Sequence, residues 1–182
     1  MRTEAWTALL AGATGLVGRE CRTDFDRLHE HPDWFQVDKV FCALGTTIRQ
    51  AGSQEAFRRV DYEYPLAIAK AARARGASHF LLVSAHGASA RSRVFYNRVK
   101  GELEEAVQAL GYPSLTIARP SLLLGNRKEP RFGEELAKRL GWLAPPSWRP
   151  VHASQVASAL VAAAHTNAPG VRILENTFLR AA

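Results

Sequence analysis

Tyr96 and Lys100 lie four residues apart and could act as an acid–base pair. The segment 94–110 has the apolar spacing of a helix, and residues at i and i+4 share one helix face. A phenol, with a reference pKa near ~10, is a poor acid–base catalyst at neutral pH, and a nearby ammonium favours the phenolate. Taken alone, the pair could equally be a surface contact. Ser84 favours catalysis, because it ends a predicted strand where α/β sheets bind ligands and could hold a carbonyl oxygen beside Tyr96.

A glycine-rich turn follows the first apolar run of the chain, residues 7–11, and opens a predicted helix. Its glycines are Gly12, Gly15 and Gly18, spaced G-x-x-G-x-x-G. The first would allow a tight turn, the second would let the backbone approach a pyrophosphate, and the third would let the helix pack close to the strand. Free N–H groups at the helix start would face the phosphates. Such turns also occur without a ligand, but the position between strand and helix favours dinucleotide binding.

Strand and helix patterns alternate along the chain, with short apolar runs for strands and apolar residues every three or four positions for helices. This alternation indicates an α/β fold, a doubly wound parallel sheet of the Rossmann type. The expected strands are 7–11, 39–44, 79–84, 114–118 and 171–174, and the expected helices are 53–75, 94–110, 132–140 and 154–165. In the first of these helices, Pro65 predicts a kink or a new start. The helix is predicted because its apolar residues are spaced by three or four: Phe57, Val60, Tyr64, Ile68 and Ala71.

Composition limits the classes of protein. The 182 residues suffice for a single domain with a full core. The net charge of +7 comes from Lys and Arg residues scattered along the chain, which argues against a nucleic-acid partner. No window is apolar enough for a membrane span, no signal peptide is evident, and no zinc-ligand spacing occurs. Cys21 and Cys42 form no disulfide framework, so we expect a reducing, cytoplasmic location.

Several motifs in register resemble one family. They are VFYNRVKGELE (94–104), FCALGTT (41–47), RPSLLL (119–124) and RKEPRFGE (127–134). These motifs resemble the atypical short-chain dehydrogenases/reductases, the group of the human Tat-interacting oxidoreductase-like protein and its small bacterial homologues. The resemblance covers residues 7–20 and nearly everything from residue 37 onward. Four motifs in register make it much more specific than a glycine turn alone.

The resemblance implies NADP(H) binding, with Tyr96, Lys100 and Ser84 as catalytic residues. Ala85 stands where the human-type sequence has a second serine, so Ser84 must take the serine's role. Together with the glycine turn, the candidate cofactor contacts are Gly12, Thr14, Gly15, Leu16, Val17, Gly18, Asp24, Leu44, Gly45, Leu123 and Arg131. Leu44 and Leu123 could equally well be ordinary core residues, and Arg131 could be an exposed surface charge. No metal site is expected.

The sequence departs from the family's pattern between Gly18 and Lys39, where no β-like run occurs. A Rossmann unit needs a helix, a second strand and a charged residue about 20 residues past the glycines to meet the ribose. The segment from Asp24 already resembles the one after the family's third strand, whose acidic residue lies near the adenine, so about 30 residues are missing. In one interpretation, the sequence joins two stretches that are not consecutive in the protein, and a Cα–Cα step longer than ~3.8 Å between Arg19 and Asp24 would reveal the gap. In the other, the deletion is genuine. One continuous helix here also fits the apolar spacing.

The leading hypothesis is an NADP(H)-dependent oxidoreductase that transfers hydride to or from a small carbonyl or alcohol substrate. NAD(H) stays possible, because the residues that select between the cofactors would lie in the missing unit. Two alternatives stay open: a regulatory, redox-sensing protein that binds NADP(H) and a protein partner without turnover, and an NAD-dependent epimerase/dehydratase-like protein. Tyr96, Lys100 and Ser84 favour an enzyme, since a sensor needs only the glycine turn. His86 lies beside the proposed site without a carboxylate partner in sequence, so a structural role is expected.

Overall fold

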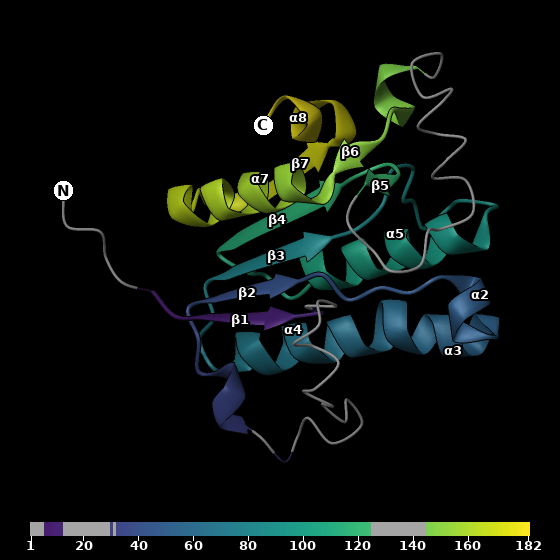
Figure 1. Cartoon of the computed structure of the whole chain (residues 1–182). Coiled ribbons are helices and arrows are strands. Elements are labelled where there is room, and N and C mark those ends of the chain that lie inside the picture. The colour runs from purple at the N-terminus through teal and green to yellow at the C-terminus, as the bar shows by residue number, and fades with distance from the viewer. Residues whose placement is uncertain (1–5, 13–29, 31, 125–144) are drawn as a thin grey trace.

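The computed structural model describes residues 6–12, 30, 32–124 and 145–182, and a sheet of five parallel strands lies at its centre (Figure 1). The strands are β1 (Ala8–Ala11), β2 (Lys39–Cys42), β3 (His79–Val83), β4 (Ser114–Arg119) and β7 (Gly170–Glu175). Their order in the sheet is β1-β2-β3-β4-β7. Each strand overlaps a segment with a strand prediction. The expected α/β fold of the Rossmann type is confirmed.

Helices cover both faces of this sheet (Figure 1). α4 (Tyr64–Ala74) and α5 (Phe95–Gln108) lie on one face, and α7 (Ala153–Thr166) and α8 (Asn176–Ala181) lie on the other. The two long helices α5 and α7 occur where the apolar spacing predicts them. Within the part of the chain that the structure describes, no helix is long and apolar enough to cross a membrane.

β3 shows how the sheet divides two apolar cores. Leu82 packs in the cluster under α4 and α5, where Leu103 is also buried. The preceding residue, Leu81, packs in the cluster under α7, together with Leu160. Successive side chains of a strand point to opposite faces, so a strand covered on both sides is apolar throughout rather than alternating. This is why short continuous apolar runs predict the strands correctly here.

The helix predicted over 53–75 is divided into pieces. α3 (Gln54–Arg58) is followed by a π-helical turn, Arg59–Glu63, and then by α4. Pro65 explains the change, because proline has no N–H to donate to the carbonyl four residues earlier, which belongs to Asp61. Its ring also crowds that carbonyl, and a wider turn relieves the crowding. Of the predicted kink or new start at Pro65, the structure shows a new start, because α4 begins at Tyr64 with Pro65 in its first turn.

Not all the apolar residues of this segment face the core. Phe57 and Ile68 are buried, whereas three residues of the same apolar spacing are only partly buried: Val60, Tyr64 and Ala71. The residue that follows each of them is buried instead. For Val60 that next residue is Asp61, which is fully buried. The π-helical turn therefore turns a carboxylate, not an apolar side chain, toward α5.

Several short elements were not expected, because they are too short to show a period. They are the 3-10 helices Pro32–Phe35 and Pro146–Trp148, the helix α2 (Ile48–Ala51), and the paired strands β5 (Leu123–Leu124) and β6 (Val151–His152). The helix predicted over 132–140 lies outside the described residues.

β1 forms one edge of the sheet, and β2 is its single strand neighbour among the described residues. In the strand order 3-2-1-4-5-6 of a dinucleotide-binding sheet, the first strand has neighbours on both sides. The strand expected on the other side of β1 would belong to the unit that the sequence analysis predicts to be missing. The predicted long Cα–Cα step between Arg19 and Asp24 lies outside the described residues, so the nature of the deletion stays a prediction.

Candidate functional site

The carboxyl ends of the parallel strands bring the candidate residues to one edge of the sheet. β1, β2 and β3 are paired in parallel register, so they end side by side. Gly12 follows β1, Leu44 and Gly45 come shortly after β2, and Ser84 follows β3. Ligands of open α/β sheets bind in the crevice outside these strand ends. Four candidates from three distant segments therefore lie where a dinucleotide would bind.

Gly12 lets β1 and β2 approach each other closely at this edge. Its φ of +86° belongs to the left-handed region, where side chains other than glycine are strained. A Cβ on Gly12 would lie 2.5 Å from the carbonyl carbon of Ala43 and 2.5 Å from the amide nitrogen of Leu44. Both are main-chain atoms that no side-chain rotation can move away. The first glycine of the turn is therefore required by the backbone itself, as the sequence predicts.

The rest of the glycine turn lies outside the described residues, as do two further candidates. These are Thr14, Gly15, Leu16, Val17 and Gly18 in the turn, and Asp24 and Arg131 elsewhere. Their contacts with a dinucleotide stay predictions.

Tyr96 and Lys100 lie in the first two turns of α5, four residues apart as predicted. Tyr96 is partly buried, and its ring packs against the fully buried ring of Phe57, with 5.4 Å between the centroids. The Lys100 side chain is only 4% exposed. Both side chains of the pair are therefore held by packing, which a surface contact would not require.

Asp61 holds the ammonium of Lys100. The Nζ of Lys100 lies 2.7 Å from Oδ1 of Asp61, whose side chain is 0% exposed. The other carboxylate oxygen, Oδ2, accepts a hydrogen bond from the backbone N–H of Thr46 at 2.8 Å. Phe57 and Asp61 are four residues apart, as Tyr96 and Lys100 are, so two matching contacts join the segments. The sequence analysis missed Asp61, although a carboxylate within a stretch predicted to be an amphipathic helix next to Pro65 was the available signal.

Gly45 lies directly over this ion pair. A Cβ at Gly45 would be 3.3 Å from Oδ1 of Asp61 and 3.5 Å from Nζ of Lys100. The absence of a side chain at this position leaves space beside both charged groups. The structure therefore brings a predicted cofactor contact and the predicted catalytic lysine together.

Cys42 ends β2 close to these residues but is unsuited to act as a nucleophile. It is buried, and burial raises the pKa of its thiol to about 11. The thiol therefore stays protonated near neutral pH, whereas the thiolate is the reactive form. Cys42 contributes to the apolar core under α4 and α5 instead.

Ser84 places a hydroxyl at the end of β3. The residue is buried, and its backbone N–H donates to the carbonyl of Ala118 at 2.8 Å. Its Oγ has no hydrogen-bond partner among the described residues. Buried hydroxyls are nearly always paired, so an unpaired one at a strand end is a group that a ligand oxygen would satisfy. This fits the role predicted for Ser84, although no distance here ties it to Tyr96.

His86 follows two residues later and lies against an aromatic side chain. Its backbone N–H donates to the carbonyl of Pro120 at 2.8 Å, and its ring meets the ring of Trp148 edge-on, with 5.0 Å between the centroids. Nδ1 of His86 is buried and has no hydrogen-bond partner in the described parts of the chain. The predicted structural role fits the packing against Trp148, and no carboxylate contact is seen for this histidine within those parts.

Two predicted cofactor contacts pack against apolar cores. Leu44 is partly buried against the core under α4 and α5. Leu123 lies in β5, pairs with Val151, and packs against the core under α7. The alternative of ordinary core packing is therefore observed for both leucines, and a contact with a cofactor stays a prediction.

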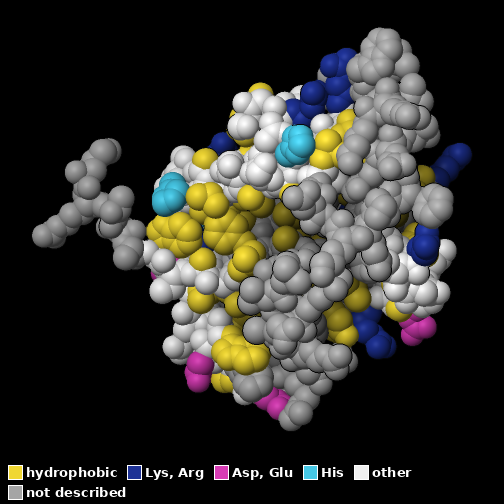
Figure 2. Space-filling model, in the orientation of Figure 1, with side chains coloured by type: hydrophobic (Ala, Val, Ile, Leu, Met, Phe, Trp, Pro, Cys, Tyr) yellow, Lys and Arg dark blue, Asp and Glu magenta, His cyan; other side chains and the backbone are white. Residues whose placement is uncertain are grey.

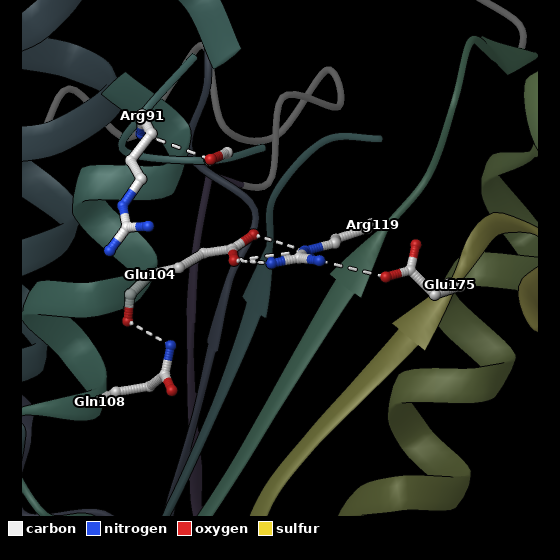
Figure 3. A network of polar contacts seen from close by, with 6 residues as sticks. Arg91, Glu104, Gln108, Arg119 and Glu175 are labelled. Carbon is white, nitrogen blue, oxygen red and sulfur yellow. Dashed lines mark hydrogen bonds and ion pairs between the residues drawn. The ribbon is translucent and has the colours of Figure 1, made fainter. Parts of the chain in front are cut away.

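Arg119 anchors α5 to the ends of β4 and β7 (Figure 3). Its Nε lies 3.1 and 3.2 Å from the two carboxylate oxygens of Glu104, and its Nη2 lies 2.5 Å from Oε2. Its Nη1 donates to Glu175 at 3.1 Å. The hydrogen bonds to Glu104, followed by those to Glu175, raise the pKa of Arg119. Since Glu104 lies one turn after Lys100, this network fixes the helix that carries the candidate catalytic pair.

Metal ligands were not expected from the sequence. In residues 6–12, 30, 32–124 and 145–182, no three His, Cys, Asp or Glu side chains are grouped so that they could hold a metal ion.

The parallel sheet, the glycine at the end of β1 and the Tyr96–Lys100 pair on α5 define a protein of the Rossmann fold. The spacing of Tyr96 and Lys100 on this helix is the one on which the resemblance to the short-chain dehydrogenases/reductases rests. The sequence is 44% identical over 126 residues to Protein HTATIP2 of Rattus norvegicus, an alignment that covers 69% of this chain and 52% of the relative. It is 41% identical over 120 residues to the mitochondrial protein FMP52 of Lodderomyces elongisporus, covering 63% of this chain and 50% of the relative. The predicted resemblance is confirmed.

The chain thus spans about half the length of the curated relatives it matches. No protein-family profile matches the sequence. Among solved structures, MoeE5 in complex with UDP-glucuronic acid and NAD has a TM-score of 0.71 at 15% identity, covering 92% of this chain and 75% of that one. A dTDP-4-dehydrorhamnose reductase from Bacillus anthracis in complex with NADP has a TM-score of 0.66 at 15% identity, covering 92% and 73%. At this identity the likeness concerns the fold.

Proposed function

We propose that the protein is an NAD(P)(H)-dependent oxidoreductase that transfers hydride to or from a small carbonyl or alcohol substrate. The observation that carries the proposal is the packing of Tyr96 and Lys100 on one face of α5, with Lys100 held beside Gly45 at the carboxyl edge of the sheet. Buried charges beside a partly buried phenol are unusual in a structural core, and such arrangements concentrate at functional sites.

Each side chain has a defined part in carbonyl reduction. When bound, the nicotinamide would supply hydride to the carbonyl carbon. Tyr96 would donate its phenolic proton to the carbonyl oxygen, and the ammonium of Lys100 would stabilise the phenolate that remains. The hydroxyl of Ser84 would donate a hydrogen bond to the same oxygen, which also satisfies its unpaired Oγ. Alcohol oxidation uses the same transfers in reverse.

We further propose NADP(H) as the preferred cofactor. The resemblance supports this preference, whereas the titles of the similar structures name NADP for one protein and NAD for another. Calorimetric titration of the protein with NADPH and with NADH decides between them. Tighter binding of NADPH is the expected result, and equal or tighter binding of NADH would contradict the preference.

Substitution of Tyr96 tests the catalytic assignment. We expect Tyr96→Phe to lower kcat by ~100-fold or more, since it removes the proton donor, while NADPH affinity changes little. Lys100→Met should weaken both turnover and NADPH binding. Tyr62→Phe is the matched control, because it removes a phenol that is not among the site residues, although it lies next to Asp61 in the π-helical turn.

Turnover is measured as NADPH oxidation with a panel of aldehydes and ketones. Equal turnover by the wild type and Tyr96→Phe would refute the assignment. Binding of NADPH without turnover on any compound would favour the regulatory alternative. Interconversion of nucleotide sugars with retained cofactor would favour the epimerase/dehydratase-like alternative.

Partners and location are also proposals. We propose a small-molecule substrate and no nucleic-acid partner. Among the described residues on the face shown in Figure 2, the Lys and Arg side chains form several separate groups. We propose a cytoplasmic location, which fits the buried, free Cys42. The FMP52 relatives are named mitochondrial, so imaging of the tagged protein is the direct test.

A further inference from the structure

We propose that Asp61 is a positioning residue that holds Lys100 for the reaction, a role that rests on the proposed function. The side chain of Asp61 is 0% exposed, so it does not reach a substrate and acts through the ammonium 2.7 Å away. Its second oxygen is fixed by the backbone N–H of Thr46. One end of the carboxylate is thus tied to the loop after β2, and the other to α5.

The geometry of the two helical segments supports this role. Phe57 contacts Tyr96 and Asp61 contacts Lys100, so contacts at the same spacing align both members of the catalytic pair. The π-helical turn at Arg59–Glu63 brings Asp61 inward, and π-helical turns are frequent at functional sites.

Stability alone does not account for this ion pair. Removing two charges from water is expensive, and an apolar pair of similar volume is often as stable or more so. The ammonium of Lys100 carries three N–H donors, so its contact with one oxygen of Asp61 leaves donors for Tyr96 and a cofactor. The pair also lies under Gly45, where the absence of a side chain leaves room beside it.

A double-mutant cycle tests the proposal. The variants are Asp61→Asn, Lys100→Met and the two combined, and the measured quantity is kcat per NADPH-binding site titrated in the same preparation. A merely structural role would change the number of folded sites but not kcat per site. We expect Asp61→Asn to lower kcat per site by about tenfold or more in the wild type and by less than about twofold in the Lys100→Met background.

Glu102→Gln is the matched control. Arg58 and Glu102 form an ion pair between the same two segments, but their side chains are 39% and 30% exposed. This variant should keep kcat per site within about twofold of the wild type. If Asp61→Asn fails to fold, Gly45→Ala keeps both charges and places a methyl group 3.3 Å from Oδ1 and 3.5 Å from Nζ. It should lower kcat per site several-fold.

The outcomes separate this inference from the proposed function. Absence of NADPH and NADH binding or of turnover in the wild type would overturn the proposed function and this inference with it. Normal wild-type turnover with an unchanged kcat per site in Asp61→Asn, or in Gly45→Ala if that variant is used, would overturn this inference alone. Equal losses from Asp61→Asn in both backgrounds would do the same.

Discussion

Replacing Arg119 with methionine should destabilise the protein mainly because it leaves the buried carboxylate of Glu104 without a partner. Glu104 is 2% exposed, and Arg119 supplies the guanidinium that faces both of its oxygens. Breaking a buried ion pair by removing one partner costs about 3–5 kcal/mol. The second contact of Arg119, with Glu175, contributes little, because that side chain is 50% exposed and exposed pairs are worth ~0–1 kcal/mol.

The variants needed are Arg119→Met, Glu175→Gln and the double variant Glu104→Leu/Arg119→Met. Urea or guanidinium unfolding gives the free energy of unfolding of each. We expect a loss of about 3–5 kcal/mol for Arg119→Met and below about 1 kcal/mol for Glu175→Gln. The double variant should recover most of the loss, because it leaves no buried charge.

Two results would refute this reasoning. One is a loss of unfolding free energy for Arg119→Met no larger than that for Glu175→Gln, which would mean that the buried contact with Glu104 stabilises the protein no more than the exposed one. The other is a double variant that is less stable than Arg119→Met, which would mean that the unpaired charge of Glu104 is not the cause. In either case the network of Figure 3 would not be what fixes α5 against β4.

Two further predictions concern backbone and pH. Gly12→Ala should lower the free energy of unfolding by about 2–5 kcal/mol, because the added Cβ would lie 2.5 Å from main-chain atoms. Gly111→Ala should lower it by only about 1 kcal/mol, because Gly111 has a φ of +63° but open space around it. Equal losses in unfolding experiments would contradict this prediction. Burial lowers the pKa of His79 from 6.5 to about 4. Between these two pH values the unfolded chain binds a proton at this histidine and the folded chain does not. The free energy of unfolding therefore falls as the pH drops from 6.5 to about 4. His79→Leu should flatten this dependence of the free energy of unfolding on pH; an unchanged dependence in His79→Leu would mean that other groups cause it.

Much of the fold follows from local pattern. β3 is apolar at every position but its first, so a strand buried on both faces is the simplest interpretation, and the structure confirms it. The spacing of Tyr96 and Lys100 is equally local, since residues four apart on a helix share a face. Each of these predictions needs information from no more than a few neighbouring residues.

Asp61 could not be placed in this way. Its contact with Lys100 joins residues 39 apart, as their numbers show, and depends on the packing of two helical segments. The local pattern pointed to the apolar Val60, which is only partly buried, whereas the neighbouring Asp61 is fully buried. The contact of Arg119 with Glu175 is likewise invisible in sequence, because parallel strands far apart in the chain bring the two together.

The catalytic half and the cofactor-selecting half of the proposed site depend on different parts of the chain. The roles of the catalytic residues and the NADP preference can therefore be refuted independently of each other. Gly45, Ser84, Tyr96 and Lys100 lie in the described region, and in the proposed function they would face the nicotinamide and the reacting carbonyl. The selection between NADP and NAD would depend on a charged residue after the second strand of a Rossmann unit, in the stretch that is predicted to be missing. A chain that binds both cofactors weakly would therefore contradict the NADP preference while leaving the roles of Tyr96 and Lys100 open to the same kinetic tests. Loss of turnover in Tyr96→Phe with unchanged cofactor binding would support catalysis whichever cofactor is preferred.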